Sequence, residues 1–296
     1  MPRMAIITMA LVLAASSGGA QEPVDEPTFD WTGTVAPGAT VRLDVGDGEI
    51  RVTPSADHQM TVHGQRRHGG LVFQAVTEGN NVTICVFRRG SRCAIDGVHG
   101  HFHIAVQVGI HQSSADLTVA LPPGATLIAH TSDGGIDVRG AGAGVTAESG
   151  DGDIRIAESS GAVRAHTSDG KIRIDTILGS VWARSGDGRV FVSNATGSVE
   201  ASTADGDVEV RLAAVDTAQR IKVHTGSGTV TVYLPASFAG DVDAHTSDGK
   251  IDSEMLLPIS GRLDPRHVRA TLGTNGGARL DIDSSDGDIH LKKTLR

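Results

Sequence analysis

The sequence has 296 residues, including 38 glycines but only two tryptophans, one tyrosine and six phenylalanines. Abundant glycine, few aromatic side chains and a hydrophobic fraction of 39% argue against a helix-rich enzyme and favour many tight turns around a thin core of small aliphatic residues. The formal net charge of −9 at pH 7 argues against nucleic acid and anionic membranes as partners.

Residues 1–20 have the pattern of a secretory signal peptide. Arg3 precedes an apolar stretch from Ala5 to Ala15, and the small residues Gly18 and Ala20 stand where a signal peptidase requires them. We therefore predict cleavage after Ala20 and a mature chain that is periplasmic or secreted. The apolar stretch is far shorter than the ~20 residues that span a bilayer, and no second hydrophobic span follows. The mature chain is not expected to cross a membrane.

Residues 21–39 are predicted to form an acidic, proline-bearing leader, after which the repeating part of the chain begins. The segment from Val41 to Val52 alternates aliphatic and polar residues on both sides of an Asp47-Gly48 turn. Such alternation predicts two short strands joined by a tight turn. The remainder of residues 40–126 is less regular, and we expect it to form an N-terminal β region.

Cys85 and Cys93 lie in this N-terminal region, with seven residues between them. In an oxidising compartment this spacing favours a disulfide that closes a loop at the end of a strand. A metal pair is the alternative, but zinc sites usually use a shorter cysteine spacing and need partners at a matching distance. A disulfide here would fasten a loop and perform no chemistry.

His99, His101 and His103 form a local cluster of metal-binding side chains. In an extended strand all three point to the same face, where a metal ion could bind. The alternative is a solvated strand face opposite Phe102, which is favoured because no carboxylate or thiolate stands at a supporting spacing. We therefore expect no cofactor, while a metal at this cluster stays an open alternative.

From residue 127 onward the chain consists of tandem sequence repeats of eighteen residues. Each copy combines alternating small and aliphatic residues with a Ser/Thr-x-Asp-Gly turn and an aliphatic-x-aliphatic triplet. The pattern predicts two short strands per copy, with Asp capping its own backbone and Gly accepting positive φ. The Asp-Gly turn recurs at Asp47-Gly48, Asp133-Gly134, Asp151-Gly152, Asp169-Gly170, Asp187-Gly188, Asp205-Gly206, Asp248-Gly249 and Asp286-Gly287.

Units of fixed period that cannot bury a face alone are typical of solenoids. A left-handed hexapeptide helix needs an aliphatic residue every six positions, whereas Val163, Ile172 and Val181 are nine apart. We therefore predict an all-β fold for residues 127–296, a two-sheet β-solenoid that is like a parallel β-helix. Residues 40–291 are expected to form one continuous domain, and layers about 4.8 Å apart would place equivalent side chains in columns.

The period lengthens after Gly206, first to 22 and then to 21 residues. The last copy, from Ala278 to Leu291, follows a longer excursion and is predicted to be the C-terminal cap of the stack. Its polar tail, residues 292–296, is expected to blunt the exposed end.

Stacking predicts two outward columns. The first contains the turn aspartates, whose like charges repel at a spacing of roughly 5 Å. Turn capping with solvent screening is favoured over a calcium-stabilised β-roll, because such rolls carry a further glycine-rich motif that is missing here. Imidazole, carboxylate and guanidinium groups pair favourably along the second column, which contains His130, Glu148, His166, Arg184, Ser202, His224 and His245.

Trp182 is the most suggestive aromatic residue, because the alternation points it outward between Arg164 and Glu200. An exposed tryptophan on a repeat face can contact a sugar or a protein partner. A cation–π contact with the neighbouring arginine is the alternative. Trp182 is therefore our candidate for surface binding.

Catalytic motifs are missing from the sequence: it contains no Gly-x-Ser-x-Gly elbow, phosphate loop or His-Glu-x-x-His. Glycine pairs such as Gly150 and Gly152 precede strands rather than helices and punctuate turns. We therefore expect a protein that is not an enzyme. A polysaccharide-processing enzyme is the alternative, since β-helices host such activities, but its site needs clustered carboxylates or bases, and the period spreads the carboxylates here.

Three features together resemble the bacterial putative-adhesin family, a domain of unknown function built from β-strand repeats. They are the Val-x-Leu-Pro-x-Gly approach at Val119–Gly124, the recurrent Thr/Ser-x-Asp-Gly-x-Ile-x-Val copies, and the Gly276–Leu280 lead into the last turn. The resemblance covers roughly Thr40 to Leu291. It implies an adhesin-like binding or scaffold module of the cell envelope, with an envelope, glycan or protein ligand and no catalytic residues.

Overall fold

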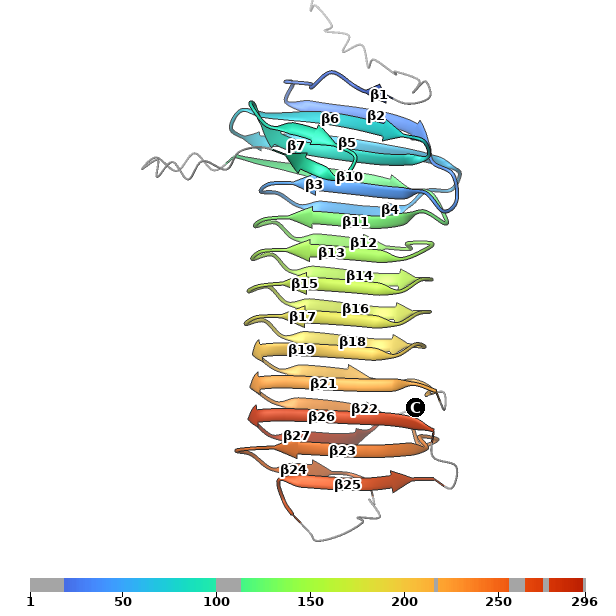
Figure 1. The fold of residues 1–296 in the computed structure, drawn as a ribbon, viewed down its shortest axis with the longest axis vertical. Helices are drawn as coiled ribbons and strands as arrows, with labels where there is room; N and C mark the ends of the chain where they lie inside the picture. Colours follow the sequence, from blue (N-terminus) through green and yellow to red (C-terminus); the bar gives the residue numbers. More distant parts are fainter. Residues whose placement is uncertain (1–18, 100–112, 216–217, 256–263, 274–276, 295–296) are drawn as a thin grey trace, which may run out of the picture.

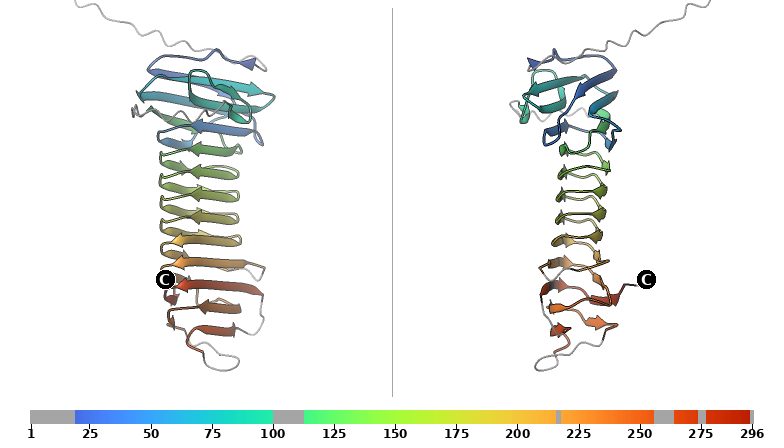
Figure 2. Two further views of the ribbon diagram at one scale, coloured as in Figure 1. Left: turned by 60° about the vertical axis from the view of Figure 1, so that its left-hand side comes forward. Right: turned by 90° about the vertical axis from the view of Figure 1, so that its right-hand side faces the viewer.

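The structure, a computed structural model, describes residues 19–99, 113–215, 218–255, 264–273 and 277–294. Its strands stack in layers along one long axis, so the molecule is a rod (Figure 1). Viewed from the side, two sheets face each other across a narrow interior (Figure 2). The described ranges contain strands and no helix, which confirms the predicted all-β, two-sheet solenoid. No segment in those ranges is therefore a helix that could span a membrane.

The first sheet has thirteen strands among the described residues. Along the rod from its N-terminal end, they are β1 (Gly19–Ala20), β6 (Leu71–Glu78), β7 (Asn81–Arg88), β3 (Thr40–Val45), β11 (Thr126–Thr131), β13 (Val145–Ser149), β15 (Val163–Thr167), β17 (Val181–Ser185), β19 (Val199–Asp205), β21 (Arg220–Ser227), β26 (Ala278–Asp286), β23 (Gly240–Thr246) and β25 (His267–Leu272).

The second sheet has twelve strands in the same ranges, and β8 (Arg92–Ala94) and β9 (Gly97–His99) form a separate small ribbon. Its order is β2 (Thr28–Thr34), β5 (Gln59–His68), β10 (Ser114–Leu121), β4 (Ile50–Pro54), β12 (Ile136–Arg139), β14 (Ile154–Ser159), β16 (Ile172–Ile177), β18 (Val190–Ala195), β20 (Val208–Arg211), β22 (Val230–Leu234), β27 (Ile289–Lys293) and β24 (Ile251–Ser253).

Parallel pairing between successive copies explains the period of eighteen residues. Val163 pairs with Val145 on one side and with Val181 on the other, and all three side chains are buried. Each copy therefore places its aliphatic residues directly above those of the preceding copy. Burying one such side chain contributes about 1.5–3 kcal/mol, and the layers together form one continuous core from Phe29 to Leu291.

A buried hydroxyl closes most turns of the solenoid; the exceptions are Val45 in the first repeat and Ser284 in the last. The Oγ1 of Thr167 lies 3.0 Å from the carbonyl oxygens of both Gly150 and Gly152 in the preceding layer, and it accepts the N–H of Gly170 at 3.2 Å. The sequence led us to expect capping by aspartate, but the turn aspartate Asp169 is exposed. Equivalent hydroxyls donate to the adjacent layer from Thr131, Ser149, Ser185, Thr203, Thr225 and Thr246.

Glycine is needed at these turns because the backbones of adjacent layers approach closely, and not because the turn requires a positive φ. Neither Gly152 nor Gly170 is among the described residues with positive φ, so that part of the expectation is wrong for these turns. A Cβ on Gly170 would overlap the carbonyl group of Gly152 in the preceding layer. Positive φ occurs instead at another corner of the coil, at Gly140 (64°), Glu158 (59°), Thr176 (57°) and Asn194 (53°), each eighteen residues after the last.

The last copy of the repeat does not cap the stack. β26 lies between β21 and β23, and β27 lies between β22 and β24 (Figure 1). The predicted C-terminal cap with a polar tail at the exposed end is therefore wrong. After β22 the chain skips one layer, forms β23 and β24, adds β25 antiparallel to β23, and then fills the skipped layer with its final copy. At this end of the rod, the last strands of the two sheets are β25 and β24.

The N-terminal region extends both sheets beyond the first repeat. β7 continues the 13-stranded sheet past β3, and β10 and β5 continue the other sheet past β4. Cys85 and Cys93 form the predicted disulfide, with a Cα–Cα distance of 5.9 Å. Cys85 is buried beside Val72 and Phe87, so the bond fastens the β8 and β9 ribbon to β7.

The two-residue strand β1 adds to the edge of the first sheet. Gly19 and Ala20 pair with Thr77 and Val76 of β6. Cleavage after Ala20 would remove this strand, while the next backbone hydrogen bond, from the N–H of Gln21 to the carbonyl of Ala75, would belong to the mature chain.

Candidate functional site

The outward face of the 13-stranded sheet carries the candidate site. Alternate side chains of a strand point outward, and the parallel register aligns them across strands. They line a groove with a volume of about 1430 Å³ that runs from Glu148 on β13 to Arg269 on β25. These are eight neighbouring strands, a length of roughly 34 Å at about 4.8 Å per strand. The groove is therefore long enough for an extended ligand.

The predicted column of alternating charge lies in this face, but its order differs at the C-terminal end. Because β26 is inserted, Asp283 stands between His224 and His245. A carboxylate thus separates two imidazoles, which reduces their repulsion when they are protonated. The whole column reads Asp44, His130, Glu148, His166, Arg184, Ser202, His224, Asp283, His245 and His267.

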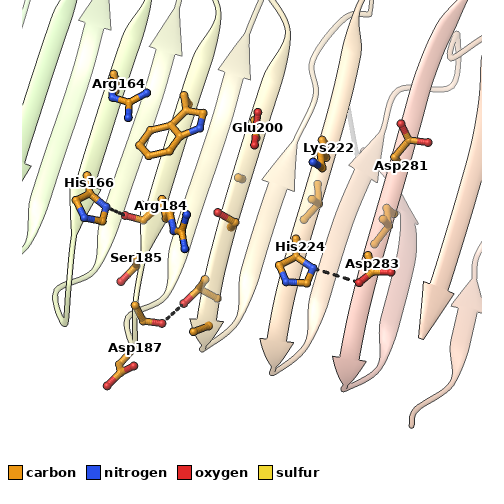
Figure 3. A pocket seen from close by; sticks show the side chains of 18 of the residues that line it. Arg164, His166, Arg184, Ser185, Asp187, Glu200, Lys222, His224, Asp281 and Asp283 are labelled. Atoms are coloured by element: carbon orange, nitrogen blue, oxygen red, sulfur yellow. Dashed lines mark hydrogen bonds and ion pairs between the residues drawn. The ribbon is translucent and has the colours of Figure 1, made fainter. Parts of the chain in front are cut away.

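Histidine and arginine side chains contact the carboxylates in the C-terminal half of the groove. His224 Nδ1 lies 3.2 Å from Asp283 Oδ1 (Figure 3). Asp243 contacts both His267 Nε2 at 2.8 Å and Arg269 Nε at 3.1 Å. These acidic groups are therefore held by partners within the protein.

His130 and Asp44 form a coupled pair at the N-terminal end of the same column, with 3.3 Å between Nδ1 and Oδ1. The hydrogen bond that His130 donates to Asp44 outweighs partial burial and raises the pKa of His130 above its ordinary value. Burial alone would raise the pKa of Asp44, but hydrogen bonds from His130 and from the N–H of Val98 leave that pKa below its usual range. The pair therefore favours protonated His130 beside an ionised carboxylate.

Trp182 lies on β17 between Arg164 and Glu200, as the alternation predicts. The guanidinium of Arg164 lies 3.8 Å from the indole centroid, so the cation–π alternative is realised. The side chain is nevertheless partly exposed. It lines the long groove and also a second hollow of about 690 Å³ beside small residues such as Gly144 and Ser180. The indole thus forms the boundary between the two hollows.

Arg164, His166 and Arg184 share the N-terminal half of the groove with the carboxylates of Glu148 and Glu200. Arg164 and His166 come from β15 and Arg184 from the neighbouring β17 (Figure 3). His166 Nδ1 lies 3.2 Å from the carbonyl oxygen of Arg184, which orients the imidazole. Within the described part of the chain, neither guanidinium has a carboxylate partner. Two guanidiniums without an ion-pair partner therefore lie near the indole, in the same part of the groove as Glu148 and Glu200.

The turn aspartates lie at one end of the strands, and Asp169 and Asp187 line the rim of the groove. Burial, followed by the charge of Asp133 in the adjacent layer, raises the pKa of Asp47, as expected for stacked carboxylates. Across the ranges that the structure covers, no three His, Cys, Asp or Glu side chains are close enough to hold a metal ion.

A different set of aspartates, which the repeat pattern alone did not indicate, accepts backbone hydrogen bonds. Each of these residues directly follows an Asp-Gly pair, and this recurring Asp-Gly-Asp sequence is the pattern from which they could have been predicted. Each carboxylate accepts the N–H of a residue in the neighbouring layer, from Lys171 to Asp153 at 2.9 Å, from Thr229 to Asp207 at 3.0 Å and from Lys250 to Asp288 at 2.9 Å.

Of the histidine cluster, only His99 can be placed. Its Nε2 lies 2.7 Å from Asp96 Oδ1 on an exposed loop. His101 and His103 lie outside the described residues, so a metal site at this cluster is untested.

A second aromatic and cationic row lies on the outward face of the other sheet and was also missed. The guanidinium of Arg173 lies 4.3 Å from the Phe191 ring centroid. Arg211 lies between Phe191 and Tyr233, at 5.6 Å and 4.6 Å, and Lys292 lies 5.9 Å from Tyr233. The alternation that points Trp182 outward applies equally to these rings.

The stacked copies and the grooved sheet define a two-sheet β-solenoid made of short repeats. The chain belongs to the Toastrack DUF4097 family, which it matches over residues 40–292. The resemblance to a β-strand repeat family of unknown function is thereby confirmed.

Solved structures were also matched at low identity. One is a putative cell adhesion protein from Clostridium sporogenes ATCC 15579, with 10% identity and a TM-score of 0.33, covering 90% of this chain and 100% of that chain. Another is a putative adhesin from Bacteroides fragilis NCTC 9343, with 10% identity and a TM-score of 0.42, covering 89% of this chain and 96% of that chain. A search of curated proteins found no match.

Proposed function

We propose that this protein is an exported, non-enzymatic binding module of the adhesin type, which holds an envelope ligand on the outward face of its 13-stranded sheet. The observation that carries the proposal is the long groove beside Trp182. A rigid sheet presents the groove, so little conformational entropy would be lost when a ligand binds. Such a surface suits attachment, because contacts are spread along many layers.

The state of the carboxylates supports binding rather than catalysis. Glycoside hydrolysis needs one protonated carboxyl group and one free carboxylate on either side of the bond to be cleaved. Asp243 and Asp283 in the groove are instead engaged by histidine and arginine partners. Glu148 and Glu200 lack such partners but stand on strands three spacings apart, about 14 Å, which is more than the ~6.5–9.5 Å between the two carboxyl groups of an inverting glycosidase. Release of reducing ends or unsaturated products from a panel of polysaccharides would contradict the non-enzymatic part of the proposal.

The Cys85–Cys93 disulfide supports the export part, because such bonds persist in oxidising compartments. Fractionation of cells that express an epitope-tagged chain, with mass spectrometry of its N-terminus, tests this directly. We expect an extracytoplasmic protein that begins at Gln21. A full-length chain in the cytoplasm would contradict export.

The binding part is tested by capturing solubilised envelope material on the purified mature chain. We expect Trp182→Ala to lose most of the captured material. Phe191→Ala is the matched control, because it removes a ring stacked under an arginine on the opposite sheet, and we expect it to bind as the unmodified chain does. Equal capture by both variants and the unmodified chain would contradict the placement of the site.

A further inference from the structure

We infer that His245 and His267 chelate one divalent cation of the zinc, nickel or copper type at the C-terminal end of the long groove. The two histidines lie on the neighbouring antiparallel strands β23 and β25 and are direct partners in the register. The inference concerns a separate site and does not depend on the proposed function. It follows from the spacing of the two rings, the hydrogen bonds around them and the charge of this part of the sheet.

The spacing of the two rings fits a shared cation. Zinc binds an imidazole nitrogen at about 2.0–2.1 Å, which places the metal about 3.2 Å from the ring centroid. Two imidazoles on one tetrahedral cation therefore have centroids about 5.2 Å apart. The ring centroids of His245 and His267 are 5.5 Å apart, with the ring planes at 77°. The backbone thus holds the two rings at the separation that a shared cation requires.

The hydrogen bonds leave a free nitrogen on each ring. His267 Nε2 lies 2.8 Å from Asp243 Oδ1, and since an ionised carboxylate only accepts hydrogen bonds, this nitrogen carries the proton. In the neutral ring the lone pair is then on Nδ1, which can bind a metal. Metal-binding histidines usually donate their other N–H to a carboxylate in this way. Neither nitrogen of His245 has a hydrogen-bond partner among the described residues.

The charges around the pair favour a cation. The outward face of β26, β23 and β25 carries four carboxylates and two guanidiniums, those of Asp241, Asp243, Asp281, Asp283, Arg269 and Arg279. Asp283 is the neighbour of His245 on the side away from His267. A surplus of negative charge on these three strands therefore lowers the electrostatic cost of binding a divalent cation.

The protein supplies two ligands to this cation. Within the described ranges no group of three His, Cys, Asp or Glu side chains could hold a metal ion, so water completes the coordination. Imidazole suits zinc, nickel and copper, whereas magnesium and calcium prefer oxygen ligands. We therefore expect the site to bind the first three cations and to exclude magnesium.

The test is a titration of the mature chain, produced without a polyhistidine tag, with zinc chloride by isothermal titration calorimetry. His101 and His103 could bind zinc independently, so every protein in the test carries His101→Gln and His103→Gln as its background. We expect one zinc site in this background. Zinc binding should weaken at least about tenfold in His245→Gln and in His267→Gln, because a lone imidazole loses the advantage of chelation. Magnesium chloride should give no binding.

The matched control is His166→Gln, which removes a histidine of the same outward column whose register partners are Glu148 and Arg184. It should bind zinc as the background does. Electron paramagnetic resonance of the copper-loaded background gives a second readout, since we expect splitting by two nitrogen ligands and by one fewer in each single-histidine variant. Circular dichroism and the melting temperature show whether each variant is folded.

Unchanged zinc affinity in His245→Gln and His267→Gln would overturn the inference, as would the absence of binding to the background at millimolar zinc. Loss in only one of the two variants would mean that a single imidazole binds the metal, which contradicts chelation. Zinc binding that appears only when His101 and His103 are restored would place the metal on those residues and equally overturn the inference.

Discussion

The turn hydroxyls act at the scale of single residues, because each binds a carbonyl of the adjacent layer and a backbone N–H of its own turn. Ser185 Oγ donates to the Gly170 carbonyl at 2.8 Å and accepts the Gly188 N–H at 2.9 Å. Ser185→Ala leaves both buried groups unpaired, and we expect it to lower the free energy of unfolding by about 1–3 kcal/mol. Denaturant titration measures this loss.

The chain contains a matched control for this prediction. Ser284 is also buried, but its hydroxyl has no hydrogen-bond partner in the described structure. Ser284→Ala should therefore be neutral or slightly stabilising. Equal losses in the two serine variants would contradict the role that we assign to the turn hydroxyl.

Thr176 holds a left-handed backbone conformation, with φ of 57°, that is unfavourable for a β-branched residue. The equivalent residue in the next copy is Asn194, a type that tolerates this conformation. We expect Thr176→Asn to raise the free energy of unfolding by about 0.5–1 kcal/mol. Thr146→Asn, at an extended position of β13, should give no gain. A destabilised Thr176→Asn would contradict this account of the corner.

The His130–Asp44 pair makes stability depend on pH. The pKa of His130 is raised in the folded chain, chiefly by its hydrogen bond to Asp44. The stabilisation is therefore complete below the unfolded pKa of about 6.5 and is lost as pH rises through the higher folded pKa. We expect the urea concentration at the unfolding midpoint to decrease as the pH is raised from 6 to 8.5. In His130→Gln this decrease should be smaller. The same pH profile in both proteins would contradict this.

At the scale of elements, the inserted last copy is the main departure from a simple solenoid. Since β26 has neighbours on both sides and β25 is an end strand, we expect slow amide exchange in β26 and β21 and faster exchange in β25 and β24. Hydrogen exchange followed by mass spectrometry resolves these segments. Exchange in β26 that is faster than in β25 would mean that the last copy lies at the end of the rod.

Elements could be predicted from the sequence where a local pattern determines them. Alternation around each Asp-Gly turn predicts the strands from Leu127 to Val192, because period two and a tight turn leave few other solutions. The order of layers at the C-terminal end could not be predicted. β23 and β21 each present inward aliphatic residues that fit β26, since Val242 and Ile221 both pair with Leu280. Only the three-dimensional fit decides which layers are neighbours.

For the whole molecule, the candidate site is a property of the stack rather than of any segment. The sequence placed Trp182 between Arg164 and Glu200 because that interval has an unbroken period of eighteen. It could not show that Asp283 enters the histidine column, or that Arg164 and Arg184 lack carboxylate partners. Those properties depend on the inserted copy and on side-chain positions, which a repeat pattern does not determine.

The central claim is the order of the layers that brings these side chains into one groove. It is tested most directly by a pulsed electron paramagnetic resonance distance between spin labels on Glu148→Cys and Asp283→Cys, because the two native cysteines are joined to each other. In the order described here, five strand spacings separate β13 from β26, so we predict a backbone separation of about 24 Å. A separation of about 34 Å, seven spacings, would place the last copy at the end of the rod and contradict the account.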